Sequence, residues 1–282
     1  MRKYECITSD AEIAELVPVL EARDCIAVDF EGEFNLHIYG EHLCLVQIFD
    51  GESYYIIDPR SGGVSPKGLG IFFQSGVQKI FFDAQSDASL VHKRYGMTIR
   101  NVYDIRIPAM LLGYTGNLLG LEELYLGIDN TGGKKKKQTS NWLVRPLGEE
   151  QIEYALSDVE HLIELKDILG KEIQEKGLEK ECEGRMRRAL TVKTPVQPWK
   201  KVGDWRRMSK AEKVYVRYIF LARDSIAERF NVPAVRVMEK HMILKLASAP
   251  PRSQSELSKV LEEAPPRFRK LLQAALWTAL SR

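Results

Sequence analysis

The stretch Cys25-Ile-Ala-Val-Asp-Phe-Glu31 decides how the rest of the chain is interpreted. Its apolar and β-branched residues predict a short buried strand that ends in two acids. Because side chains alternate between the faces of a strand, Asp29 and Glu31 point the same way, roughly 6–7 Å apart. Two adjacent carboxylates repel each other, and a cation between them would remove that repulsion. A polar strand end that runs into an acidic loop explains the pair as well, so the outcome depends on whether further carboxylates reach the same place.

The segments around this strand predict a mixed α/β sheet with flanking helices. A helix over 11–22, capped by Asp10, precedes it, and a hairpin signal joins strands over 42–49 and 53–58. The domain is therefore expected to open with a three-stranded antiparallel meander. Strands at 78–82 and 101–103 then alternate with helices near 66–75, 86–95 and 104–112, which implies parallel additions to the sheet. A long helix is expected from about 147 to 174.

Composition and charge divide the chain into two parts. Its 282 residues are 44% hydrophobic and 28% charged, as in an ordinary globular protein that buries a full core. From Thr191 onward there are 19 basic and 8 acidic residues, a net charge of +11, against 22 basic and 31 acidic residues before it, a net charge of −9. This asymmetry suggests a basic module for a polyanionic partner, although a solvated helical bundle can also be basic.

The expected domain boundaries follow from a proline-containing segment over 194–203. They place a first domain at residues 1–190, a linker at 191–208 and a helical domain at 209–282.

Several classes of protein are excluded by the sequence. No apolar run approaches the roughly 20 residues that span a bilayer, and the first residues lack the apolar core of a signal peptide, so a cytoplasmic protein is expected. The 5 histidines form no zinc-protease motif, and the 4 cysteines include no Cys-x-x-Cys pair. Any metal should therefore be a hard cation with oxygen ligands.

Three further acids stand near the predicted strand ends. Asp87 lies at the head of a helix that follows the strand over 78–82, where a first-turn acid favouring the helix dipole is common. Asp83, at the end of that strand, competes with it for a functional role. Asp104 is expected to cap the next helix and to be structural.

A tyrosine and an acid share one face of the long predicted helix. Tyr154 and Asp158 are four residues apart, which places their side chains about 6 Å from each other beside the apolar stripe. Such a pair alone means little, because surface helices contain many of them.

Taken together, these segments resemble the DEDD superfamily of 3′–5′ exonucleases, in the subgroup with a catalytic tyrosine, and most of all the ribonuclease D family. The resemblance rests on Asp29-Phe-Glu31, on Ala84-Gln-Ser-Asp87-Ala-Ser-Leu and on Tyr154-Ala-Leu-Ser-Asp158. The stretch Gln138-Thr-Ser-Asn-Trp-Leu-Val-Arg-Pro-Leu147 is also similar to the family. The order of these motifs and the lengths of sequence between them match the family over about residues 1–190.

The resemblance implies a ribonuclease H-like mixed sheet of five to six strands flanked by helices. It also implies two divalent ions, Mg²⁺ or Mn²⁺, about 3.5–4 Å apart on four carboxylates. Asp29 would touch both ions, Glu31 and Asp158 would hold the one that binds the attacking water, and Asp87 would hold the other. Tyr154 would orient the attacking water.

The C-terminal part resembles the small all-α HRDC domain, through Ala222-Arg-Asp-Ser-Ile-Ala-Glu-Arg-Phe-Asn-Val-Pro233. Such a domain would bind a single strand by contacts with its phosphates. Four residues near the expected site are candidates for contacts with nucleic acid: Lys135, Lys136, Gln138 and Arg145.

Three hypotheses of function follow. The first is a 3′–5′ exoribonuclease that acts on the 3′ ends of single-stranded RNA, such as tRNA precursors or other small RNAs. Such a protein is expected to be a monomer and to have no membrane partner. The second is a DNA 3′–5′ exonuclease. The third is a nucleic-acid-binding adaptor without turnover, which the filled metal positions disfavour.

Overall fold

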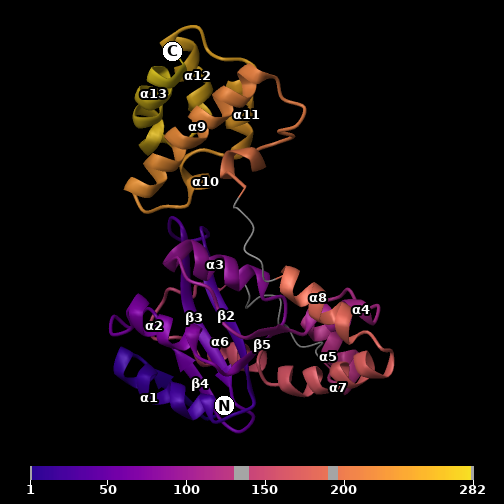
Figure 1. Ribbon diagram of the computed structural model, residues 1–282. Coiled ribbons are helices and arrows are strands. Elements are labelled where there is room, and N and C mark those ends of the chain that lie inside the picture. Colours follow the sequence, from indigo (N-terminus) through magenta and orange to yellow (C-terminus); the bar gives the residue numbers. More distant parts are fainter. Residues whose placement is uncertain (1, 130–139, 190–195, 281–282) are drawn as a thin grey trace. The chain divides into compact units, whose positions relative to one another are not determined.

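The computed structural model describes residues 2–129, 140–189 and 196–280, and the chain divides into two compact units (Figure 1). Unit 1 comprises Met1–Glu33 and Glu41–Val192, and unit 2 comprises Phe34–Gly40 and Lys193–Arg282. Each unit has its own hydrophobic core. Among the described residues, no helix combines the length and the apolar character that a membrane crossing requires.

A mixed six-stranded sheet forms the centre of unit 1. Its strands are β1 (Tyr4–Ile7), β2 (Cys25–Phe34), β3 (Glu41–Phe49), β4 (Tyr54–Ile57), β5 (Gln78–Phe81) and β6 (Val102–Asp104). The order across the sheet is β1-β4-β3-β2-β5-β6. The predicted hairpin is confirmed, because β3 and β4 pair antiparallel. The predicted parallel additions are confirmed too: β2 pairs parallel with β5, and β5 with β6.

Helices cover both faces of this sheet. The helices of unit 1 are α1 (Asp10–Glu21), α2 (Pro66–Gln74), α3 (Gln85–Tyr95), α4 (Arg106–Leu111), α5 (Leu118–Leu126), α6 (Glu149–Ser157), α7 (Leu162–Glu175) and α8 (Glu179–Ala189). Residues of α1, α2 and α3 pack with Val28 and Phe30 of β2 in one core. Residues of α4, α5 and α7 pack with Ala27 on the other face, and α6 packs there against Cys44 and Leu45 of β3.

The beginning of the chain differs from the prediction in two respects. A strand that the sequence pattern did not indicate, β1, pairs parallel with β4 at the edge of the sheet. The N-cap of α1 is Ser9 and not Asp10, because the Ser9 hydroxyl accepts from the backbone N–H of Glu12. Asp10 instead accepts from the backbone N–H and the hydroxyl of Ser65, and so joins α1 to the start of α2.

The prediction of one long helix from about 147 to 174 is wrong, because two helices occupy this range. α6 ends at Ser157, with Asp158 as its C-cap, and α7 begins at Leu162. Val159 and Leu162, on either side of the break, are both buried in the core that contains Ala27. Burial of this turn against the sheet thus interrupts a segment that is helical by its pattern.

Strand β5 contains a buried lysine. Lys79 has 0% exposure, and its ammonium donates to the backbone carbonyls of Ser75, Val77 and Arg100 over 2.9–3.3 Å. Burial lowers the pKa of Lys79 to about 8, and these three acceptors are what make the buried position tolerable.

Unit 2 is helical outside the short segment 34–40. Its helices are α9 (Lys210–Arg229), α10 (Ala234–Val237), α11 (Lys240–Ser248), α12 (Gln254–Val260) and α13 (Pro266–Leu280), with the 3₁₀ turns η2 (Pro198–Lys201) and η3 (Leu261–Glu263). α9 begins with a capping box formed by Ser209 and Glu212. Val202 is 1% exposed in the core of this unit, and Trp199 and Trp205 pack against it. Part of the segment expected to be a linker therefore belongs to the packed body of unit 2.

Candidate functional site

The strand β2 presents its acids on the face opposite to its large apolar side chains. Val28 and Phe30 point into the core beneath α1, α2 and α3. Asp29 and Glu31 alternate with them and share the face of Ala27, on which α6 and α7 pack. The predicted alternation therefore brings the two carboxylates to the same side of the sheet.

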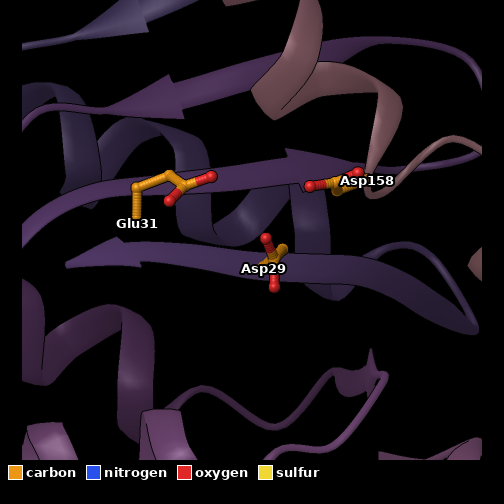
Figure 2. A group of neighbouring side chains, drawn as sticks. All are labelled: Asp29, Glu31 and Asp158. Atoms are coloured by element: carbon orange, nitrogen blue, oxygen red, sulfur yellow. The ribbon is translucent and has the colours of Figure 1, made fainter. Parts of the chain in front are cut away.

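A third carboxylate joins them from a distant part of the chain. Asp158, the C-cap of α6, lies so close that one ligand oxygen from each of Asp29, Glu31 and Asp158 is within 4.8 Å of the others. Figure 2 shows the side chains of Glu31 and Asp158 extending toward each other, with Asp29 between them on its strand. Glu31 is buried, and Asp29 and Asp158 are half-buried.

Asp87 lies in the first turn of α3. It is near this cluster, but it is not among the three residues whose ligand oxygens lie within 4.8 Å of one another. It is buried, and its charge is one of the causes that raise the pKa of Asp29. Asp104, at the end of β6, holds the beginning of α3 in place, because its carboxylate accepts from the backbone N–H groups of Asp83 and Ala84 at 2.8 and 3.0 Å. Asp104 is thus structural, as expected. Its carboxylate also accepts from the backbone N–H of Arg106, the first residue of α4, at 3.0 Å, although the N-cap position of α4 is Ile105.

Asp83, which competed with Asp87 for a role, is engaged elsewhere. Its carboxylate forms an ion pair with Arg106 and it has a positive φ of 64° at the end of β5. The ion pair compensates the charge of Asp83, whereas Asp87 remains a buried acid near other acids.

The site is strongly acidic in its electrostatics. Burial, followed by the charges of Asp87 and Asp158, raises the pKa of Asp29 well above its ordinary value. Burial also raises the pKa of Glu31, and the charges of Asp29, Asp158 and Asp87 add to this rise, in that order. Burial raises the pKa of Asp87 to about 8, with contributions from Asp83 and Asp104. Each ionised carboxylate here thus makes ionisation of the others more costly.

This donor set fits a divalent cation. Within the described residues, neither lysine nor arginine forms an ion pair with Asp29, Glu31 or Asp87. Carboxylate oxygens are the ligands that Mg²⁺, Mn²⁺ and Ca²⁺ prefer. A bound cation would supply the positive charge that the protein does not provide at this position.

Tyr154 stands beside the acidic cluster on α6. Burial raises the pKa of its phenol, and so do the nearby charges of Asp158 and Glu31 and a hydrogen bond to Asp158. The phenol therefore stays protonated at neutral pH and acts as a donor. Its ring packs against Trp142, with ring centroids 6.2 Å apart and an interplanar angle of 37°. Trp142 is 2% exposed, so it fixes Tyr154 from the core side.

Arg145, expected to contact nucleic acid, has its guanidinium occupied within the protein. Nε and Nη2 donate to the two oxygens of Asp58 at 2.6 and 2.7 Å, which is a bidentate ion pair. The remaining donors bind the backbone carbonyls of Cys44, Trp142 and Val144 over 2.8–2.9 Å. Arg145 thus fastens the segment that carries Trp142 to β3 and to the end of β4, and the contacts favour a structural role.

The other three candidates for nucleic-acid contact, Lys135, Lys136 and Gln138, lie outside the described residues, so their role stays a prediction. Two residues of evident importance were not singled out by the sequence pattern. In the sequence, Trp142 stands out only as part of a stretch that is similar to the family, and Asp58 only as the end of a predicted strand.

We expect Arg145→Gln to lower the free energy of unfolding by about 2–3 kcal/mol. Breaking a buried ion pair costs roughly 3–5 kcal/mol, and this pair keeps 25% and 10% exposure at its two side chains, which reduces the cost. Chemical denaturation measures the change. Lys93→Gln is the control, because its pair with Glu41 at 3.0 Å is exposed and should contribute less than about 1 kcal/mol. Unchanged stability with weaker RNA binding would instead favour a direct contact with nucleic acid.

Two family models match the chain. The 3′–5′ exonuclease family model matches residues 4–174, more than half of the chain. The HRDC domain model matches residues 212–273. The class defined by fold and site is therefore an exonuclease domain followed by an HRDC domain.

Relatives and solved structures place the chain more closely. Ribonuclease D of Zymomonas mobilis is 31% identical over 271 residues, which cover 92% of this chain and 67% of the relative. Ribonuclease D of Sphingobium indicum is 30% identical over 271 residues, which cover 92% of this chain and 68% of the relative. The crystal structure of Escherichia coli RNase D shares the fold, with a TM-score of 0.76 and 24% identity over 99% of this chain and 76% of that chain. The chain belongs to the 3′–5′ exonuclease family, alongside ribonuclease D.

Proposed function

We propose that this protein is a metal-dependent 3′–5′ exoribonuclease that removes nucleotides from RNA 3′ ends by two-metal hydrolysis. The observation that carries the proposal is the acidic cluster of Asp29, Glu31 and Asp158, within 4.8 Å, in a chain of the 3′–5′ exonuclease family. The choice of RNA is supported by the relatives named ribonuclease D and by the fold of Escherichia coli RNase D, an exoribonuclease involved in structured RNA processing.

The resemblance to the exonuclease family supplies the proposed roles of the carboxylates, and the positions of Asp29, Glu31 and Asp158 are compatible with them. Divalent ions, when bound, supply hydroxide at neutral pH and counter-charge for the pentacovalent phosphorus. Asp29, between the other two acids, would be shared by both ions. Glu31 and Asp158 would hold the ion on the side of the attacking water, and Asp87, from the start of α3, would hold the other. Mg²⁺ and Mn²⁺ are the ions proposed.

Tyr154 would orient the attacking water. Its phenol is protonated at neutral pH, as in any tyrosine, and the raised pKa reinforces this state; the phenol also forms a hydrogen bond with Asp158. When the attacking water is present, the Tyr154 Oη–H would turn from Asp158 and donate to the water oxygen, which leaves a lone pair of that oxygen directed at the phosphorus. Packing of Trp142 on the tyrosine ring keeps the hydroxyl at this position.

The HRDC domain would bind the strand away from the reacting end. The residues from Thr191 onward carry a net charge of +11, which suits contacts with phosphates that do not depend on sequence. The proposal includes action as a monomer in the cytoplasm on the 3′ ends of single-stranded RNA, such as tRNA precursors.

A substrate assay tests this function. We expect the protein to shorten 3′-extended single-stranded RNA labelled at its 5′ end stepwise in Mg²⁺ or Mn²⁺, and EDTA to stop the reaction, because the carboxylates need the ions to act. Each step should release a 5′-mononucleotide. RNA blocked by a 3′-phosphate is the control for the end at which cutting begins, and it should be shortened more slowly.

DNA of the same sequence is the second substrate in this assay. Faster shortening of DNA than of RNA would instead make the protein a DNA exonuclease. Binding of either strand without shortening in both metals would make it a non-catalytic adaptor.

A further inference from the structure

A pocket with a volume of about 160 Å³ lies on unit 1, away from the acidic cluster. Two of the residues that line it, Leu43 and Leu69, belong to the core that contains Val28 and Phe30. The pocket is therefore on the face of the sheet opposite to Asp29. Its polar lining comes from His42, Arg60, Arg94 and Tyr95, and we call it the Arg60–Arg94 pocket.

The two arginines bring positive charge to one place. Arg60 follows β4 and Arg94 lies in the last turn of α3, and both line the pocket. Burial raises the pKa of Tyr95, and the positive charges of Arg94 and Arg60 both oppose that rise. Both guanidinium groups thus lie within electrostatic reach of the same phenol.

The neighbouring acids do not compensate these charges. Glu41, next to the pocket on β3, pairs with Lys93 at 3.0 Å, and Asp58 pairs with Arg145 at 2.6 Å. In the part of the chain that the structure describes, no ion pair to Arg60 or Arg94 is found. Two like charges that converge on a concave surface without a carboxylate favour an anionic ligand, and paired guanidinium groups suit a phosphate in particular.

The remaining lining sets the size and character of the ligand. Leucine, valine and proline side chains supply the apolar part of the lining, and the half-buried Tyr95 also lines the pocket. The volume is below the roughly 300–1,000 Å³ of sites that enclose a drug-sized molecule, so the pocket suits one small unit and not a length of strand. A small molecule that carries a phosphate for the arginines and an apolar or aromatic group for the rest of the lining describes a nucleotide.

We propose that the Arg60–Arg94 pocket binds a nucleoside 5′-monophosphate, with Arg60 and Arg94 on the phosphate and the apolar lining residues against the ribose or base. The choice of a nucleotide rests on the proposed function, because an exoribonuclease releases this class of molecule at every step. The binding itself needs neither the metal nor hydrolysis, so it can fail or succeed independently of the nuclease activity.

The test is isothermal titration calorimetry of the full chain in EDTA, with AMP, adenosine and an RNA 10-mer as probes. We expect AMP to bind and the Arg60→Gln/Arg94→Gln double variant to bind it at least tenfold more weakly. Arg100→Gln/Lys171→Gln removes the same charge from exposed positions outside the pocket and should change the Kd less than twofold. Equal melting temperatures of the three proteins would show that folding is unchanged.

Three results would overturn the proposal. The first is no binding of AMP at millimolar concentration, and the second is equal binding of AMP by the wild type and the double variant. The third is binding of the 10-mer, and not of AMP, that depends on Arg60 and Arg94, since the pocket would then belong to a path for RNA. Adenosine should bind at least tenfold more weakly than AMP, and equal binding of the two would exclude the phosphate contact.

Discussion

Asp29→Asn is expected to slow the shortening of RNA by about 10³-fold or more. Asp29 lies between Glu31 and Asp158, and in the proposed mechanism it is the ligand that both ions share. Loss of a residue that only supports a metal ligand typically costs 10- to 100-fold, so loss of a shared ligand should cost more. Single-turnover kinetics at saturating RNA measures the effect on the chemical step.

The stability of this variant distinguishes lost chemistry from lost folding. In EDTA the substitution removes one of several buried carboxylates that repel each other, so Asp29→Asn should melt at the same or a higher temperature than the wild type. Asp83→Asn is the matched control, because Asp83 is paired with Arg106, and it should keep activity within about twofold. An Asp29→Asn variant that retains more than a tenth of the activity would contradict the assigned role.

Mg²⁺ or Mn²⁺ is expected to raise the melting temperature of the wild type by several degrees. An ion that binds only the folded state adds about 2.7 kcal/mol of stability at a concentration one hundred times its Kd. Among the described residues, neither lysine nor arginine forms an ion pair with Asp29, Glu31 or Asp87, so the ion meets uncompensated charge at these acids. Differential scanning fluorimetry with and without EDTA measures the shift, and Asp29→Asn should lose most of it.

The pH dependence of this stabilisation follows from the raised pKa values. Asp87 has a pKa of about 8 in the folded protein against 3.8 ordinarily, so the folded state holds a proton that the unfolded state releases. Its contribution to stability is complete below the ordinary pKa and is lost as the pH rises toward about 8. The metal-free protein should therefore become less stable between about pH 4 and pH 8. Over the same range the ions should bind more tightly, because they no longer compete with protons.

A melting temperature that does not respond to either ion between pH 6 and pH 8 would contradict the metal site. The measurement must use the wild type at equal ionic strength, adjusted with KCl, because salt alone screens the repulsion between carboxylates. A shift that Asp29→Asn shows as well would place the ion elsewhere.

The sequence was informative where its pattern is local and periodic. The alternation in β2 predicted that Asp29 and Glu31 share a face, and the first turn of a helix was the expected position of Asp87. The parallel pairing of β2 with β5 and of β5 with β6 followed from the alternation of strands and helices, whereas the order of the strands across the sheet was not predicted. These features depend on the side-chain period of 2.0 or 3.6, which a single sequence reveals.

Features that depend on tertiary contacts could not be predicted in this way. Arg145 binds Asp58, which is 87 residues away in the sequence. Nothing in the sequence around either residue distinguishes it from a charged residue that is exposed to solvent. The break between α6 and α7 contains neither glycine nor proline, so nothing local announces it. β1 is only four residues long, Tyr-Glu-Cys-Ile, and its assignment as a strand depends on its partner β4. In each case a contact made by the fold overrides the local preference.

The end of α6 at Asp158 gives the site a further source of negative potential. The carbonyl end of a helix carries about half an elementary negative charge. The negative end of the α6 dipole therefore lies at the carboxylates and adds to their repulsion instead of reducing it. Cations in solution would be drawn toward this point before they make any contact with a ligand. Monovalent salt weakens such attraction beyond about 10 Å at 0.1 M, so the supply of divalent ions to this protein is tied to the ionic strength around it.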